Sequence, residues 1–157
     1  KSNLLDQVEK VLVNENKELD IIIANVCNIN PKILNGFTKT LISRFPNIAD
    51  NLSIQKHDLG QNNYIQVSKN NNSRLFFCQM FTDRKNQKTK KNINYVYLSQ
   101  CLLQVRQQCH HAKKDLDKEV QIHCPKFGTG HSGGRWSTIL DMVTDYWDGI
   151  PTFFYTH

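Results

Sequence analysis

The most informative stretch of the sequence is Val120-Gln-Ile-His-Cys-Pro-Lys-Phe-Gly-Thr-Gly-His-Ser-Gly-Gly-Arg-Trp136. Its first five residues are apolar at alternate positions, which is typical of a strand. From Trp136 onward, apolar side chains recur at helical spacing as far as Trp147. The glycine-rich segment 127–134 therefore connects a strand to a helix, and open α/β sheets bind ligands at such connections.

Strand and helix patterns alternate along the rest of the chain. Residues 21–26 predict a continuous buried strand, and helical spacing follows from Phe37 to Phe45. The other predicted elements are a strand hairpin formed by 64–67 and 75–81, a helix over 94–109, a charged connector over 113–118 and a strand over 152–155. The first 20 residues fit either a helix face or an edge strand. This alternation predicts an α/β fold in which helices cover both faces of a mixed or mostly parallel sheet.

Length and composition narrow the class of protein. A chain of 157 residues corresponds to one domain, and a hydrophobic fraction of 39% is enough for one ordinary core. No apolar run approaches the ~20 residues of a membrane-spanning helix, and no secretory pattern opens the sequence. We therefore expect no membrane contact and an intracellular location, nuclear or cytoplasmic. Five irregularly spaced cysteines favour a reducing compartment, and the net charge of +6 favours an anionic partner.

The segment 127–134 has the composition of a phosphate-binding loop. Four glycines within seven residues let the backbone approach a ligand closely. Successive N–H groups followed by a helix N-terminus favour an anion, and Thr129, His131 and Ser132 add side-chain donors. The segment matches neither the Walker motif nor the dinucleotide-binding fingerprint. The alternative is a structural turn in which the glycines only supply positive φ angles.

A second polar loop, residues 25–37, follows the strand 21–26 and also leads into a helix. If the two strands are neighbours in the sheet, the two loops face each other across one crevice. The side-chain amides of Asn25, Asn28 and Asn30 are suited to ribose hydroxyls. The alternative for each of them is an ordinary turn-forming asparagine.

Five segments carry a resemblance to a known family. They are Asp20–Asn25, Gly36–Pro46, His57–Gly60, Ile122–Gly130 and Gly133–Trp136. In this order they resemble the macro domain family, whose members bind ADP-ribose, and the similarity extends over roughly residues 20–157.

Two branches of that family look most similar. The pair Asp83-Arg84 and the ending Gly149–Tyr155 resemble the macro domain of the poly-ADP-ribose-activated chromatin-remodelling ATPase. The helix that begins at Gly36 and the run Phe127–Gly130 resemble the second branch. That branch contains the terminal ADP-ribose-protein glycohydrolase and the ADP-ribose 1″-phosphate phosphatases.

The resemblance implies a three-layer α/β/α fold with a mixed sheet, and one macro-like domain over residues 1–157 with an atypical segment at 1–19. It implies that ADP-ribose is the ligand and that no cofactor is needed. The segment 127–134 would hold the diphosphate and the distal ribose, and Tyr155 or Phe154 would stack near the adenine. The distal ribose and phosphate would also meet Asn28, Asn30, Gly36 and Phe37. The adenine amino group would meet Glu15 or Glu18, or stacking alone would hold the base. The implied ligand-binding residues are Asn28, Asn30, Gly36, Phe37, Phe127, Gly128, Thr129, Gly130, His131, Ser132, Gly133 and Tyr155.

The first functional hypothesis is a non-catalytic reader of ADP-ribosylated proteins or of poly-ADP-ribose. Ser132 stands where the resemblance places the acid of the glycohydrolase, and a hydroxyl cannot replace a carboxyl group in proton transfer. The alternative is an ADP-ribosyl hydrolase or ADP-ribose 1″-phosphate phosphatase, with His131 or a lysine from 85–91 as the catalytic group. A second alternative is an RNA-binding macro-like module that uses the basic run 84–91 as its nucleic-acid contact. The cysteines and histidines fit no zinc-ligand spacing, so no metal site is expected.

Overall fold

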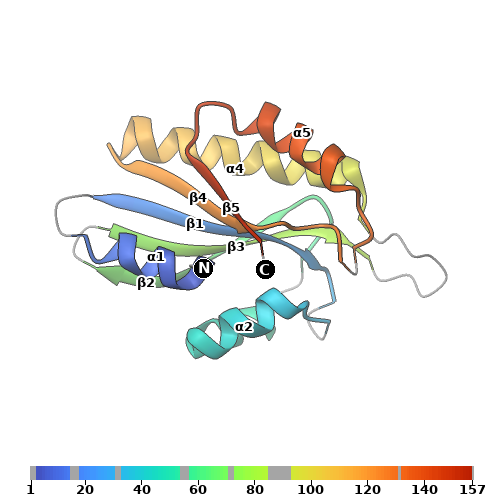
Figure 1. The fold of residues 1–157 in the computed structure, drawn as a ribbon, viewed down its shortest axis with the longest axis horizontal. Helices are drawn as coiled ribbons and strands as arrows, with labels where there is room; N and C mark the ends of the chain where they lie inside the picture. The colour runs from blue at the N-terminus through green and yellow to red at the C-terminus, as the bar shows by residue number, and fades with distance from the viewer. Residues whose placement is uncertain are drawn as a thin grey trace.

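The structure is a computed structural model of the 157-residue chain, and it describes residues 3–14, 18–30, 33–53, 57–70, 73–84, 93–130 and 132–156. Figure 1 shows the elements in chain order. They are α1 (Leu4–Leu12), β1 (Leu19–Asn28), α2 (Gly36–Arg44), the 3-10 helix η1 (Pro46–Ile48), α3 (Ala49–Ser53), β2 (Asn62–Asn70), β3 (Ser73–Asp83), α4 (Tyr95–Asp115), β4 (Glu119–Pro125), α5 (Trp136–Tyr146) and β5 (Thr152–Tyr155).

The five strands form one mixed sheet in the order β2-β3-β1-β4-β5. β1 pairs in parallel with both β3 and β4, and β4 pairs in parallel with β5. The edge strand β2 is antiparallel to β3, and the two form the predicted hairpin. Because β3, β1, β4 and β5 run in the same direction, their carboxyl ends lie along one edge of the sheet.

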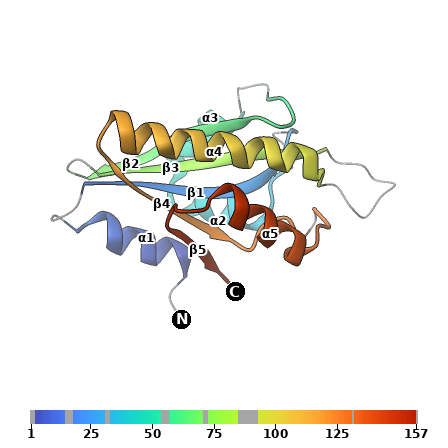
Figure 2. The same cartoon turned by 90° about the horizontal axis from the view of Figure 1, so that it is seen from above.

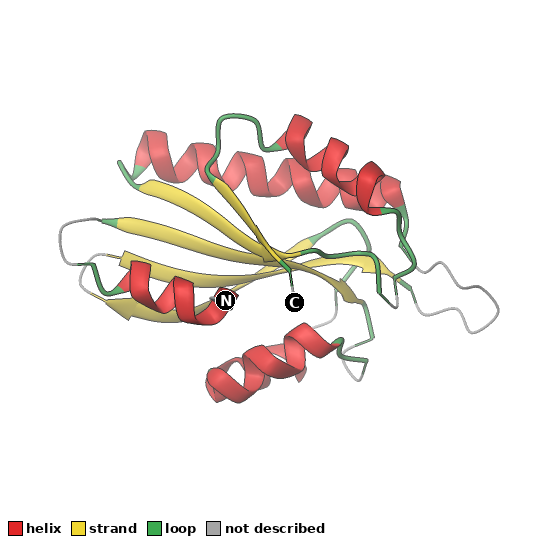
Figure 3. Cartoon of the chain, in the orientation of Figure 1, coloured by secondary structure: helices red, strands yellow, loops and turns green. Residues whose placement is uncertain are grey.

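Helices cover both faces of this sheet (Figure 3), as the sequence predicts. α4 and α5 pack on one face, where the apolar stripes of both helices meet Ile22, Ala24 and Ile122. Seen from above, α4 lies along the length of the sheet (Figure 2). α1 and α2 pack on the other face against Ile21, Ile23 and Phe77. The result is a three-layer α/β/α arrangement with one apolar core on each side of the sheet.

Three details go beyond or against the sequence expectations. The ambiguous N-terminal segment is a helix, because Leu4, Leu5, Val8 and Leu12 lie on one face and are all buried. The expected connector over 113–118 is wrong in its first half, since α4 continues to Asp115. The lysines in its last turn are favourable there because they face the negative end of the helix dipole. The short elements η1 and α3 were not predicted.

The cysteines are core residues in the structure. All five thiols are free and buried, and burial raises the pKa of Cys27, Cys101 and Cys109 to about 12. Such thiols stay protonated and behave as small apolar side chains. Within the described ranges, no helix combines the length and the apolar character that crossing a membrane requires.

Candidate functional site

A cleft of about 1090 Å³ lies where the parallel strands end. Asn28, Asp83, Pro125 and Tyr155 are the last residues of β1, β3, β4 and β5, and all four line the cleft. α2 and the first turn of α1 form the facing wall. The volume is slightly above the ~300–1,000 Å³ range of small-molecule sites.

The cleft gathers most of the ligand-binding residues expected from the sequence. Asn28, Gly36, Phe37, Phe127, Gly128, Gly130, Ser132 and Tyr155 are among its lining residues. Thr129 and Gly133 are not part of the lining, and Asn30 lines a small neighbouring cavity instead. His131, the candidate catalytic residue, is outside the described residues.

Asn35 fixes the N-terminus of α2 at the cleft. It is the N-cap of the helix, and its Oδ1 accepts a hydrogen bond from the Thr38 N–H at 2.9 Å. The same oxygen accepts from the Asn25 side-chain amide at 3.1 Å, while the Asn35 amide donates to the Val26 carbonyl at 2.8 Å. These bonds tie the positive end of the helix dipole to β1. A side chain at Gly36 would meet nothing within 4 Å, so the backbone there is open to a ligand.

The glycine-rich loop after β4 divides into two parts. The N–H groups of Gly133 and Gly134 bond inside the loop, to the carbonyls of Gly130 at 3.0 Å and Gly128 at 2.6 Å. Among the residues that the structure describes, none accepts a hydrogen bond from the N–H groups of 127–130. Phe127, Gly128 and Gly130 line the cleft, so their N–H groups are candidate donors to a ligand, and the second part of the loop holds the first in shape.

Asp83 and Ser132 form a polar pair at the β3 end of the cleft. Asp83 has only 7% of its surface exposed, and its carboxylate accepts hydrogen bonds from the hydroxyls of Ser132 and Thr82. Burial raises the pKa of Asp83, and the two hydroxyl donors partly oppose that rise. Forty-nine residues separate Asp83 from Ser132 in the chain, and no local sequence pattern reveals their contact.

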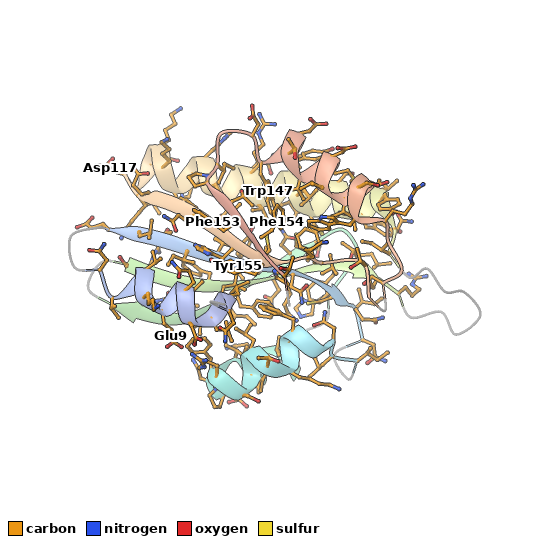
Figure 4. The ribbon with its side chains drawn as sticks, in the orientation of Figure 1. Glu9, Asp117, Trp147, Phe153, Phe154 and Tyr155 are labelled. Atoms are coloured by element: carbon orange, nitrogen blue, oxygen red, sulfur yellow. The ribbon has the colours of Figure 1, made fainter. Side chains whose placement is uncertain are left out.

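Tyr155 and Phe154 lie on opposite faces of the last strand. Figure 4 shows the two side chains next to each other along β5. Phe154 packs edge-on against Trp136, with ring centroids 5.1 Å apart, in the core under α5. Tyr155 lies on the other face and lines the cleft. Of the two aromatic residues left open by the sequence, Tyr155 is therefore the one that can stack on a ligand.

A buried histidine orients Tyr155. The Tyr155 hydroxyl is 2.7 Å from Nδ1 of His123, and Nε2 of His123 is 3.0 Å from the Gln121 side-chain oxygen. Burial lowers the pKa of His123 to about 4, so the ring is neutral near pH 7. Its Nε2–H then donates to Gln121, and its Nδ1 accepts the Tyr155 hydroxyl proton. His123, on the strand that leads into the predicted loop, thus holds Tyr155 in place at the cleft.

The two ends of the cleft differ chemically. The sheet order separates β3 from β5 by two strands, so Asp83 and Tyr155 are three strand spacings, or about 14 Å, apart. The β5 end combines Tyr155 with Leu4 and Leu5 of α1. The β3 end combines Asp83 with amide and hydroxyl groups, and the loop after β4 lies between the ends.

The remaining sequence proposals are not supported by the lining of this cleft or lie outside the described residues. Glu18 is exposed and precedes the amino end of β1, at the opposite edge of the sheet, so it cannot hold a base in the cleft. Glu15 and residues 85–91 of the basic run are outside the described residues, and Arg84 is exposed. In the parts of the chain that are described, no three His, Cys, Asp or Glu side chains come together as a metal site.

Comparison with known proteins identifies the fold. No protein-family model and no curated protein sequence matches the chain. Solved structures do: a macrodomain protein from Streptomyces coelicolor has a TM-score of 0.67 at 21% identity, covering 90% of each chain. The macrodomain of Mycobacterium tuberculosis DarG has a TM-score of 0.67 at 12% identity, over 92% of this chain and 91% of that one. Thermosipho africanus DarTG in complex with ADP-ribose has a TM-score of 0.64 at 15% identity, over 91% of this chain and 39% of the other. The chain therefore has the macrodomain fold.

Proposed function

We propose that this chain binds ADP-ribose and recognises proteins that carry it, without cleaving the modification. The order of chemical groups along the cleft carries this proposal: an aromatic and apolar end, a run of backbone N–H donors, and an end rich in amide and carboxylate oxygens. ADP-ribose has the same order of parts, with a base, a diphosphate and a terminal ribose. The complex of Thermosipho africanus DarTG with ADP-ribose, a protein of the same fold, supports this choice of ligand.

Each part of the ligand has a matching group. The adenine would stack on Tyr155, the diphosphate would accept from the N–H groups of 127–130 and face the N-terminus of α2, and the terminal ribose would lie near Asn28 and Asp83. Lys126, which also lines the cleft, adds a positive charge near the diphosphate.

A calorimetric titration with ADP-ribose tests the proposal, with AMP and ribose 5-phosphate as controls that contain only one end of the ligand. We expect ADP-ribose to bind with a Kd in the micromolar range, equivalent to about 8 kcal/mol, and each fragment to bind far more weakly. No heat and no thermal shift at millimolar ADP-ribose would overturn the proposal.

The absence of cleavage is tested with the modified protein itself. A protein ADP-ribosylated on glutamate is expected to keep its modification when incubated with the chain. Ser132 donates a hydrogen bond to Asp83, and its hydroxyl cannot act as the general acid that cleavage would require at that position. Release of ADP-ribose at a rate proportional to the amount of the chain would favour the hydrolase alternative.

Replacing Tyr155 with alanine is expected to weaken ADP-ribose binding about 5- to 150-fold, because stacking on a base contributes ~1–3 kcal/mol. Tyr155→Phe keeps the ring, so it should bind close to the wild type although it loses the hydrogen bond to His123. Leu103→Ala is the control, since Leu103 is on α4, 40% exposed, and not part of the cleft lining. Equal affinities of the Tyr155→Ala and Leu103→Ala variants in calorimetry would exclude stacking on Tyr155.

A further inference from the structure

We propose that Asp83 makes the cleft select ligands whose terminal ribose carries no phosphate. Its carboxylate accepts hydrogen bonds from the hydroxyl groups of that ribose and repels a phosphate at the same place. This inference rests on the proposed function and specifies its ligand further. It predicts that ADP-ribose is bound and that ADP-ribose 1″-phosphate is rejected.

The carboxylate of Asp83 is held in place from several sides. Its backbone carbonyl accepts from the Ile29 N–H at 3.1 Å, and its backbone also forms a bridge with Ile93. Ile93 in turn donates to the Ser132 carbonyl at 2.9 Å, which fixes the residue whose hydroxyl bonds to Asp83. In this arrangement Asp83 cannot turn away from an incoming charge without breaking several hydrogen bonds.

A register shift in the sheet places Asp83 beside Asn28. β3 has one extra residue relative to β1 after Cys27, so that Asn28 pairs with Asp83 and not with Thr82. Such bulges redirect side chains next to binding sites. Thr82 then bonds to Oδ1 of Asp83 at 2.7 Å, and Ser132 bonds to Oδ2. Each carboxylate oxygen has two acceptor positions, so about two positions remain for hydroxyl groups of a ligand.

No cation offsets the charge of this carboxylate in the described part of the cleft. The charged residues of the lining there are Arg44, Asp83 and Lys126. Arg44 is engaged in ion pairs with Asp6 and Glu9 on α1, at 3.0 and 2.7 Å. Lys126 follows β4, and its Nζ lies 5.3 Å from the centre of the Trp136 ring. A phosphate at the β3 end would therefore face a buried negative charge, where repulsion is stronger than in water.

The test compares two ligands that differ only at the terminal ribose. ADP-ribose and ADP-ribose 1″-phosphate are titrated into the wild type, the Asp83→Asn variant and the Asp141→Asn variant. Asp83→Asn removes the charge but keeps the shape and an acceptor oxygen. Asp141 is exposed on α5 and does not line the cleft, so Asp141→Asn is a matched charge control. A thermal melt of each variant confirms that it is folded.

The wild type is expected to prefer ADP-ribose about 100-fold, and Asp83→Asn to reduce this preference below about tenfold by tightening the binding of the phosphorylated ligand. The Asp141→Asn variant should keep the wild-type ratio. Equal affinity of the wild type for both ligands overturns the inference, even if the Asp83→Asn variant does not fold. An unchanged ratio in a folded Asp83→Asn variant also overturns it. If neither ligand binds the wild type, the proposed function fails and the inference fails with it.

Discussion

Replacing Gly130 with glutamate is expected to abolish ADP-ribose binding and to leave the midpoint of thermal unfolding unchanged. A side chain at this position meets nothing within 4 Å, so the loop can accept it without moving. Gly130 lines the cleft and belongs to the run of open N–H groups, so the new carboxylate would occupy the place proposed for the diphosphate. Repulsion between the two anions and the loss of space both oppose binding.

The Gly130→Gln variant separates these two causes. Glutamine has almost the same volume as glutamate but no charge, so it should retain measurable binding that the glutamate variant lacks. Both variants are measured by calorimetry with ADP-ribose and by thermal melting. Wild-type affinity in Gly130→Glu would show that the ligand does not pass over this part of the loop.

Much of the fold was predictable because its strands and helices have simple periodic patterns. The continuous apolar run at 21–26 predicted β1, and the buried stripe through Leu98, Leu102 and Val105 predicted α4. The first 20 residues remained ambiguous, since helix and strand patterns overlap in a short segment. The helix α1 packs against β1, β3 and β4, and this tertiary packing favours the helix over a strand. The local sequence pattern does not contain that information.

The candidate site was only partly predictable, because its polar contacts join distant segments. Turn chemistry explains Asn28, whose side-chain oxygen accepts the Asn30 N–H at 2.9 Å, so the structural alternative applies in part to that residue. Asn35 carries a readable signal, since an asparagine directly before a helix is a preferred N-cap. The partners Asp83 and Ser132 have no such signal. Their contact depends on the register of β3 against β1 and on the path of the loop after β4.

The sequence left two explanations for the loop glycines, a phosphate-binding loop and a structural turn that needs positive φ angles. The structure supports each explanation at different positions. Gly128 and Gly133 have φ angles of +84° and +71°, in the left-handed region that favours glycine. Gly130 has open space beside it, and because it has no side chain, a ligand can reach the backbone there. The sequence alone could not distinguish these three glycines in this way, because φ and free space are properties of the folded loop.

Gly128→Val is accordingly expected to destabilise the fold, in contrast to the same substitution at Gly130. Valine at a φ of +84° is strained by ~1–3 kcal/mol, and its Cβ would come within 2.7 Å of Cδ1 of the buried Ile139, which adds ~1–3 kcal/mol of overpacking. The sum, about 2–6 kcal/mol, corresponds to a fall of about 5–20 °C in the melting midpoint of a chain of this size. Gly130→Val adds the same side chain in open space and should melt with the wild type. Equal melting of the two variants would mean that the loop bends freely away from α5. An unequal pair would show that the loop is anchored in the core at Gly128 and is open to a ligand at Gly130.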